Sequence, residues 1–538
     1  MARTPLLGRI EETLSAIREA RERNVDVEQV LEERALTRRE LLKRAGVAGA
    51  AVAGAATFGR IAGRAYGAQQ PRIAIVGAGL AGLTCAYRLQ QAGLYAQVYE
   101  AHASRVGGRC WSYSPLRNQD PFADGQVAEH GGELIDQGHL AFRHLIQELG
   151  FTTDNLLQAQ PAGTEDFYYV NGGPYLYSQL VDDLNGIYQK MHKDVSAASY
   201  PTLWNSYTQR GWELDHMSII QWLDETVPNG GSRSNLGRVL DIAYNIEYGA
   251  ECSIQSSLNL LYLLGYSGQG QFHTFGPSNE KYHVHGGNDQ IPWELARRLT
   301  GQLNMGCELT AIKRNGDGTF TLTFRKDTSS FTATADHVVL ALPFSILRSS
   351  VNYKQAGFEP LKVTAIEELG MGTNSKLHVQ FNDRFWYGAG NNGNTYADTG
   401  YQNTWEVTRA QGGGRGKGIL VDYTGGNIGA SFGPSNGTPS DRAREFFTQI
   451  QPLFPHTDVA GHWSGAATID FWTGYQWTKG SYSYWKVGQY TKFSGMEKVR
   501  QGNCHFCGEH TSQDFQGYLN GGVETGERAA GEILGDFK

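Results

Sequence analysis

Three glycines stand at a spacing that suits the phosphates of a bound nucleotide. Gly77, Gly79 and Gly82 form a GxGxxG sequence, and Glu100 follows at the distance at which such motifs place an acidic residue. The glycines permit a tight turn and a close approach of the backbone to a pyrophosphate, while the carboxylate accepts ribose hydroxyl groups. A glycine-rich turn that binds nothing is the alternative, because the motif alone is weakly specific.

The segments around this motif have the pattern that a dinucleotide site requires. Residues 72–76 are rich in β-branched side chains, and Leu80, Leu83 and Tyr87 follow with helical spacing. A second predicted strand, 95–99, ends at Glu100. Strand, glycine loop, helix and strand together predict a Rossmann-like unit that begins near residue 72.

Further motifs extend the comparison to a known family. Arg105-Val-Gly107-Gly108-Arg109 is a second glycine-rich corner, and Gly508-Glu509-His510-Thr511 and Gly517-Tyr518 lie near the C-terminus. Together they resemble the flavin-containing amine oxidase family, which includes monoamine, polyamine and L-amino-acid oxidases. The resemblance implies FAD as the dinucleotide, with contacts at Gly77, Gly79, Gly82, Glu100, Gly108, Arg109, Gly508, Glu509 and Val523.

The resemblance also assigns three catalytic residues, Lys376, Tyr482 and Tyr518. Lys376 would reach flavin N5 through a water, and the two tyrosines would face the flavin and orient the amine. Strand alternation places Lys376, His378 and Gln380 on one face, so a solvated polar face is the alternative. For the tyrosines the alternative is two ordinary core residues among 27. Ser481 stands where monoamine oxidases have a flavin-linked cysteine, which implies non-covalent FAD.

Two acids follow the Gly131-Gly132 pair, in a segment that borders the substrate cavity of the relatives. Glu133 and Asp136 are therefore candidate substrate residues, with surface acids in a turn as the alternative. L-amino-acid oxidases use an arginine near this place to hold the substrate carboxylate. No arginine lies between 131 and 139, which favours a cationic amine over an amino acid.

Metal chemistry is not indicated by the sequence. Cys504 and Cys507 have a redox or metal spacing, but they fall in a predicted strand, where they are too far apart for a disulfide. His283 and His285 share a strand face without further ligands. We therefore expect no metal site.

The first 68 residues are typical of targeting rather than of a folded domain. Residues 1–36 predict a mixed-charge helical extension, and Arg38-Arg39 precedes an uncharged, alanine-rich run. This layout resembles a twin-arginine signal at 37–68, with a basic helix start as the alternative. It predicts an exported protein, periplasmic or extracellular, with the twin-arginine machinery as a partner.

Length and composition agree with a large globular protein. The chain has 538 residues, of which 40% are hydrophobic, and a net charge of −7 without a long basic tract, so nucleic acid is not an expected partner. We expect an α/β (α+β overall) fold in which a Rossmann-like FAD-binding domain (69–160, 280–360 and 476–538) interleaves with a substrate domain of mixed sheet and helices (161–279 and 361–475). A homodimer is compatible with this layout.

The expected activity is FAD-dependent amine oxidation. Hydride would pass from the amine α-carbon to flavin, water would hydrolyse the imine to a carbonyl compound and ammonia, and oxygen would reoxidise the flavin to give hydrogen peroxide. An L-amino-acid oxidase of the same fold is the first alternative. An FAD-dependent desaturase and a non-catalytic flavoprotein are the others.

Overall fold

The computed structural model describes residues 70–265 and 279–537. The predicted helical extension and twin-arginine signal therefore lie outside the described residues. Within the described part, no helix is both long and apolar enough to cross a membrane.

A five-stranded parallel sheet forms around the glycine motif. Its spatial order is β22-β13-β1-β2-β9, and every adjacent pair is parallel. All four residues of β1 are buried, as in a sheet covered on both faces. The sheet confirms the Rossmann-like expectation, and three distant chain segments build it: β1 (Ile73–Val76), β2 (Ala96–Glu100), β9 (Leu303–Met305), β13 (His337–Leu340) and β22 (Cys504–Phe506).

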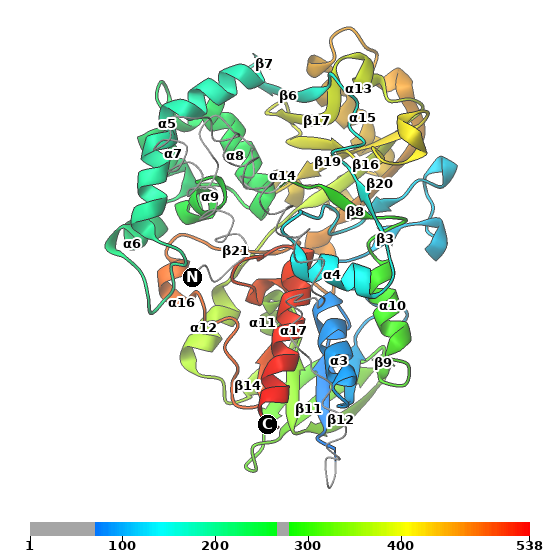
Figure 1. Cartoon of the computed structure of the whole chain (residues 1–538), viewed down its shortest axis with the longest axis vertical. Coiled ribbons are helices and arrows are strands. Elements are labelled where there is room, and N and C mark those ends of the chain that lie inside the picture. Colours follow the sequence, from blue (N-terminus) through cyan, green and yellow to red (C-terminus); the bar gives the residue numbers. More distant parts are fainter. Residues whose placement is uncertain (1–69, 266–278, 538) are drawn as a thin grey trace, which may run out of the picture. The chain divides into compact units, whose positions relative to one another are not determined.

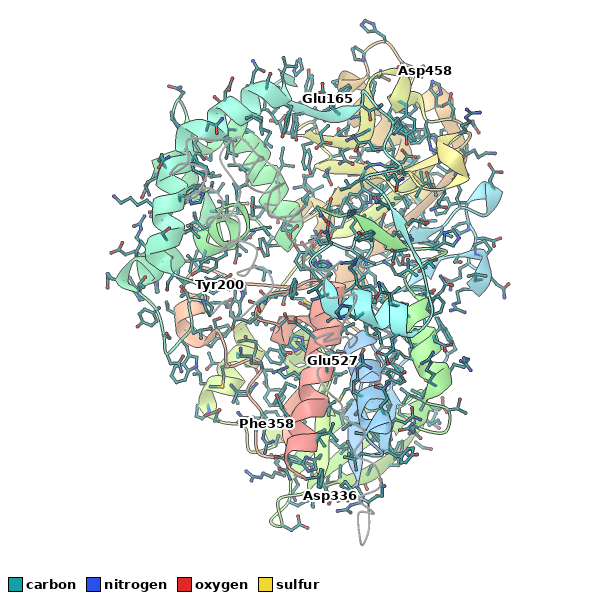
Figure 2. The ribbon with its side chains drawn as sticks, viewed as in Figure 1. Glu165, Tyr200, Asp336, Phe358, Asp458 and Glu527 are labelled. Atoms are coloured by element: carbon teal, nitrogen blue, oxygen red, sulfur yellow. The ribbon has the colours of Figure 1, made fainter. Side chains whose placement is uncertain are left out.

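Two helices from opposite ends of the chain pack together beside this sheet. Helix α3 (Leu80–Gln91) follows the glycine motif, and α17 (Leu519–Gly535) is the last helix of the chain. They lie side by side (Figure 1), and small residues allow a close approach, since a Cβ on Gly526 of α17 would stand 2.4 Å from the Ala81 carbonyl oxygen. Arg88 of α3 also pairs with Glu527 of α17 at 2.8 Å. Figure 2 labels Glu527 on the last helix.

A mixed seven-stranded sheet forms the second large layer. Its order is β20-β16-β19-β18-β17-β6-β7, and only the β17–β6 pair is parallel. The strand that the alternation of Lys376, His378 and Gln380 predicts is present as part of this sheet. The members are β6 (Glu165–Val170), β7 (Gly173–Tyr175), β16 (Ser375–Phe381), β17 (Asn391–Ala397), β18 (Asn403–Glu406), β19 (Gly418–Thr424) and β20 (Trp463–Phe471).

Five α-helices lie between residues 177 and 264, within the segment assigned above to the substrate domain. They are α5 (Tyr177–Ala198), α6 (Gln209–Asp215), α7 (Ile219–Thr226), α8 (Asn235–Tyr248) and α9 (Ser257–Leu264), and apolar residues of each pack into one hydrophobic core. Helix α8 contacts the seven-stranded sheet. Its last turn, ending at Gly249 in a left-handed conformation, reaches the cavity described below.

Smaller elements complete the described fold. A four-stranded sheet in the order β12-β11-β10-β14 follows β9 in the chain. It consists of β10 (Glu308–Arg314), β11 (Phe320–Lys326), β12 (Ser329–Ala335) and β14 (Asn352–Gln355). The remaining elements are β3 (Ser112–Tyr113), β4 (Ala128–Glu129), α4 (Leu140–Glu148), β5 (Thr153–Asn155), β8 (Tyr282–Val284), α10 (Gln290–Arg298), α11 (Phe344–Ser350), α12 (Pro360–Glu368), β15 (Gly370–Met371), α13 (Phe385–Gly388), α14 (Gly426–Ala430), α15 (Pro439–Ile450), β21 (Ser483–Tyr484) and α16 (Gln489–Phe493), with short 3₁₀ turns between them.

Candidate active site

One cavity of about 320 Å³ joins the glycine loop to the seven-stranded sheet. Its walls include the carboxyl ends of β1 and β2, the start of α17, and residues of β16, β18 and β19. The cavity therefore lies where ligands bind in open α/β sheets, outside the carboxyl ends of the strands. Most of the residues predicted from the sequence line it.

The three glycines of the motif meet three different requirements. Gly77 has φ +102°, and a Cβ there would lie 2.8 Å from the carbonyl oxygen of Ala341. A Cβ on Gly82 would lie 2.0 Å from the Gly77 carbonyl oxygen, so this glycine permits close helix packing and does not line the cavity. Around Gly79 nothing lies within 4 Å. The open space at Gly79 is where a pyrophosphate can approach the backbone.

Glu100 ends β2 at the cavity wall, as predicted. Its carboxylate oxygens accept the N–H groups of Ala78 and His102, both at 2.8 Å. Burial raises the pKa of Glu100, while these two hydrogen bonds oppose the rise. Each oxygen keeps a further lone pair, so the group is still able to accept ribose hydroxyls.

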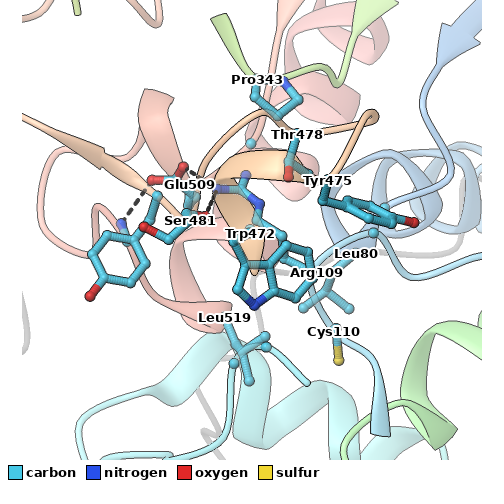
Figure 3. Close-up of a pocket in the computed structure, with 18 of the residues that line it drawn as sticks. Leu80, Arg109, Cys110, Pro343, Trp472, Tyr475, Thr478, Ser481, Glu509 and Leu519 are labelled. Carbon is cyan, nitrogen blue, oxygen red and sulfur yellow. Dashed lines mark hydrogen bonds and ion pairs between the residues drawn. The ribbon is translucent and has the colours of Figure 1, made fainter. Parts of the chain in front are cut away.

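Arg109, which is half-buried, and Glu509, which is buried, form an ion pair at the cavity (Figure 3). The guanidinium Nη1 lies 2.8 Å from Glu509 Oε1 and donates to the carbonyl of Ser481 at 2.7 Å. Oε2 of Glu509 accepts the Ser483 hydroxyl and the Gly517 N–H. Burial opposes ionisation of Glu509, but the charge of Arg109, the neighbouring His510 and the hydrogen bonds from Arg109 and Ser483 together lower its pKa. The pair therefore ties together chain segments that are far apart in sequence.

The other predicted cofactor positions divide into two groups. Gly108 and Gly508 line the cavity with positive φ values of +58° and +132°. Val523 is fully buried in the apolar core and is not a lining residue. The lining residue there is Gly522, in the first turn of α17. Helical geometry turns the Val523 side chain toward the core, and its contact with FAD stays a prediction.

Lys376 lies in the cavity wall and is only 4% exposed, so the solvated-face alternative is wrong. Its Nζ donates to the carbonyls of Glu129 (3.0 Å) and Gly131 (2.9 Å) and to Oε2 of Glu133 (2.8 Å). These bonds use all three hydrogens of the ammonium group. A water between Lys376 and a flavin, as the family resemblance implies, would therefore have to replace one of them.

The two predicted substrate acids have different positions. Glu133 lines the cavity, but its charge is compensated by Lys376, and its Oε1 accepts the indole N–H of Trp405 at 2.8 Å. Asp136 is outside the lining and accepts the backbone N–H groups of Asn279 and Glu280. Asp136 thus holds the turn that leads to Glu280, and its role toward the substrate stays a prediction.

Two cavity acids were not predicted. Glu247, in the last turn of α8, and Glu280 both line the cavity, and no described cation pairs with either. Burial raises the pKa of Glu247 to about 7. Burial, together with neighbouring acids such as Asp136, raises that of Glu280 to about 8. Neither acid belongs to a sequence motif. For Glu247, a glutamate in a helical pattern ordinarily indicates a solvent-exposed helix face.

The predicted tyrosine pair also lines the cavity. The Tyr518 hydroxyl donates to Oε1 of Glu247 at 2.8 Å. The Tyr482 hydroxyl donates to the Ile246 carbonyl at 2.7 Å and lies 2.8 Å from the hydroxyl of Tyr423. Both phenols are thus fixed by α8 and β19, and neither is an ordinary core residue. Such a pair can orient a substrate and exclude water.

Ser481 occupies the lining position expected for the flavin-linking residue. Its hydroxyl donates to Oδ1 of Asn374 at 2.6 Å, and its carbonyl accepts from Arg109. A serine hydroxyl cannot form the thioether that a cysteine forms at this place.

Comparison with known proteins supports the geometry. The family model described as flavin containing amine oxidoreductase matches residues 80–534. A putative L-amino-acid oxidase, YobN, from Bacillus subtilis is 24% identical over 87% of this chain and 95% of its own length. Polyamine oxidase 7 from Oryza sativa subsp. japonica is 24% identical over 86% of this chain and 94% of its own.

Solved structures share the fold. Putrescine oxidase bound to putrescine has a TM-score of 0.71 and 21% identity, covering 87% of this chain and 99% of its own. Cyclohexylamine oxidase from Brevibacterium oxydans IH-35A has a TM-score of 0.73 and 21% identity, covering 87% of this chain and 100% of its own. The mixed α/β architecture is therefore one that is known from amine oxidases.

Proposed function

This chain belongs to the flavin-containing amine oxidoreductase family, and we propose that it oxidises a cationic amine with FAD as the cofactor and oxygen as the electron acceptor. The observation that carries the proposal is a pair of acids, Glu247 and Glu280, which no cation among the described residues compensates and which share a cavity with the two tyrosines. A positively charged ligand would stabilise both carboxylates in their ionised form.

The cavity residues fit an FAD molecule. The open space at Gly79 suits the pyrophosphate, and the carboxylate of Glu100 at the end of β2 suits a ribose. Helix α17 begins at the cavity, so its first N–H groups can stabilise negative charge on a reduced ring system. Ser481 in the linking position supports non-covalent binding.

FAD supplies the hydride acceptor for the oxidation of the amine α-carbon, and oxygen then removes the electrons as hydrogen peroxide. The chain's own residues position the substrate. Tyr482 and Tyr518 hold the amine between their rings and exclude water. A pKa of about 7 lets Glu247 take up the proton that the reacting ammonium loses. Hydrolysis of the released imine gives the carbonyl compound and ammonia.

Glu280 is assigned to a second cationic group of the substrate. It lies in the same cavity as Glu247, and the two negative charges raise each other's cost of ionisation when no cation is present. A substrate with two ammonium groups would relieve this cost at both ends. We therefore favour a diamine or polyamine over a simple monoamine, and the putrescine oxidase and polyamine oxidases among the similar proteins agree with this preference.

An L-amino-acid oxidase is the less favoured candidate. A substrate carboxylate needs a free cation, but Arg109 and Lys376 are both paired with glutamates. Arg105 donates to the Gly108 carbonyl at 2.8 Å and to the Tyr475 hydroxyl, and its guanidinium lies over the Trp111 ring. The described cavity wall thus contains no uncommitted cation. A desaturase or a non-catalytic flavoprotein would not require two acids and two tyrosines that line the same cavity.

The test is a peroxide assay on purified holoenzyme. The panel contains putrescine, the monoamine butylamine of the same chain length, an arylalkylamine and several L-amino acids. We expect the highest kcat/KM with putrescine or a longer polyamine. Turnover confined to L-amino acids would support the alternative instead, and the absence of turnover with every compound would favour a desaturase or a binding protein.

A further inference from the structure

Two histidines and an aspartate meet near the amino-terminal edge of the parallel sheet, away from the cavity. His337 begins β13, His505 lies in β22, and Asp536 follows α17. His505 is in register with Val339, which shares a face of β13 with His337, so both imidazoles lie on one face of the sheet. We propose that His337, His505 and Asp536 form a zinc site that joins the last helix to the sheet.

The distances suit a zinc ion. One ring nitrogen of each histidine and one oxygen of Asp536 all lie within 4.8 Å of one another. Nδ1 of His337 and Nε2 of His505 are 3.3 Å apart. Two nitrogens bound to tetrahedral zinc at about 2.0–2.1 Å are separated by about 3.3 Å. Oδ2 of Asp536 is 3.9 Å from His337 Nδ1, so the carboxylate has to move closer to the imidazoles to complete the same tetrahedron.

A second carboxylate orients one of the imidazoles. Oε2 of Glu532 lies 2.7 Å from Nδ1 of His505, whose side chain is fully buried. When Nδ1–H is donated to Glu532, the lone pair of Nε2 points toward His337 and Asp536. A carboxylate behind a metal-binding histidine is the usual outer partner in zinc sites. Glu532 and Asp536 are four residues apart and thus lie on one side of α17.

Arg500 and Phe537 contact two of the proposed zinc ligands, Asp536 and His337. Nη1 of Arg500 donates to both carboxylate oxygens of Asp536, at 2.9 and 2.8 Å. These side chains are 37% and 30% exposed, so Asp536 can turn one oxygen to a metal while Arg500 keeps the other. The Phe537 ring lies 5.4 Å from that of His337 and shields the site on that side.

The proposed site has three protein ligands, and water would take the fourth position. Without a metal, the short contact between His337 and His505 is a hydrogen bond that contains one proton. Zinc binding releases this proton to solvent, because both ligand nitrogens must be unprotonated. None of the three ligands lines the cavity, so the site has a structural role and is independent of the proposed amine oxidation.

The test is calorimetric titration of untagged, chelator-treated holoenzyme with ZnCl₂, together with thermal unfolding in zinc and in EDTA. We expect one zinc ion per chain and a higher Tm in zinc. Glu532→Gln is expected to weaken zinc binding 10- to 100-fold. Asp536→Asn is expected to weaken it at least tenfold, and this partly exposed position avoids the folding risk of a change at His505.

His462→Gln is the matched control, because His462 also pairs with an aspartate, Asp383, but lies at the surface. It is expected to leave zinc binding unchanged. Absence of saturable zinc binding by the unmodified protein overturns the proposal. So does binding whose affinity is the same in Asp536→Asn as in the unmodified chain. Neither result depends on whether the protein oxidises amines.

Discussion

Nζ of Lys376 lies 2.8 Å from Oε2 of Glu133, and this ion pair joins β16 to the segment that forms one wall of the cavity. Both side chains are 5% exposed. Lys376 also binds the carbonyls of Glu129 and Gly131, and the indole N–H of Trp472 binds that of His130 between them at 2.9 Å. The backbone carbonyls of three consecutive residues, 129–131, thus accept hydrogen bonds from Lys376 and Trp472. Lys376 therefore fixes the position of this segment of the cavity wall in addition to contributing its charge.

The first prediction concerns this ion pair. Lys376→Met leaves a buried, uncompensated carboxylate at Glu133, and removing one member of such a pair costs about 3–5 kcal/mol of unfolding free energy. The double variant Lys376→Met/Glu133→Gln is expected to recover most of that loss, as measured by denaturant unfolding. Lys492→Met, in the exposed pair with Glu368, is the control and should cost under about 1 kcal/mol.

The same variant tests the catalytic role implied by the family resemblance. We expect flavin reoxidation by oxygen to slow at least tenfold in Lys376→Met, which corresponds to about 1.4 kcal/mol of transition-state stabilisation. Stopped-flow measurement of the two half-reactions separates this effect from slower reduction by the amine. If both rates equal those of the unmodified enzyme, Lys376 is a structural residue only.

The second prediction concerns Glu280 and substrate charge. Glu280→Gln removes the carboxylate assigned to the distal ammonium and is expected to raise KM for putrescine at least tenfold, or about 1.4 kcal/mol. KM for butylamine should change less than twofold, since this substrate has no second charge. Steady-state peroxide assays measure both values, and Glu225→Gln on the exposed surface of α7 is the control. Equal changes for the two amines would contradict the assignment.

The third prediction concerns pH. The pKa values of Glu247 and Glu280 are raised to about 7 and about 8, so both carboxylates ionise as the pH rises through this range. We expect kcat/KM for a diamine to increase between pH 6 and pH 8, and Glu247→Gln to remove the ionisation near 7 from the profile. A profile that is unchanged in this variant would rule out Glu247 as the proton acceptor.

The raised pKa values of Glu247 and Glu280 are expected to lower the stability of the folded protein as the pH rises, whereas kcat/KM increases. A carboxyl whose folded pKa lies above its ordinary value of 4.5 contributes stability that is fully present below pH 4.5. This contribution is lost as the pH rises through the folded pKa, up to about 8 for Glu280. Tm of the ligand-free protein should therefore depend less on pH over this window in Glu247→Gln/Glu280→Gln.

The fourth prediction concerns the linkage of the cofactor. Because Ser481 donates its hydroxyl to Asn374 and has no thiol, acid precipitation should release yellow FAD into the supernatant. Absorbance of the supernatant and of the redissolved pellet measures the division. Flavin that remains with the polypeptide would show that another residue forms a covalent bond.

The fifth prediction concerns export, which we propose on the basis of Arg38-Arg39 and the uncharged run after it. Replacing both arginines by lysine retains the charge but removes the guanidinium pair. We expect the protein to accumulate in the cytoplasm, as shown by cell fractionation and immunoblotting. Export of the Lys-Lys form at the normal level would exclude the twin-arginine route.

The sequence by itself determined the dinucleotide-binding unit. Gly77 and Gly82 are required by the local backbone, since one has a positive φ and the other has no room for a side chain. These requirements depend on residues that are near one another in the chain, so they are visible in the sequence as glycines at a fixed spacing. The family resemblance likewise placed Lys376, Tyr482 and Tyr518 correctly in the cavity wall.

Only the tertiary structure decided which charges remain available in the cavity. The position of Glu133 after Gly131-Gly132 predicts a substrate acid, and Lys376, more than two hundred residues away in the chain, compensates its charge. Glu247 and Glu280 lie on a helix and a turn that have no motif, and packing brings them into one cavity where no cation of the described chain pairs with them. Whether a carboxylate is paired depends on which distant segments fold against it, and the low dielectric of a buried site makes that difference decisive for its pKa.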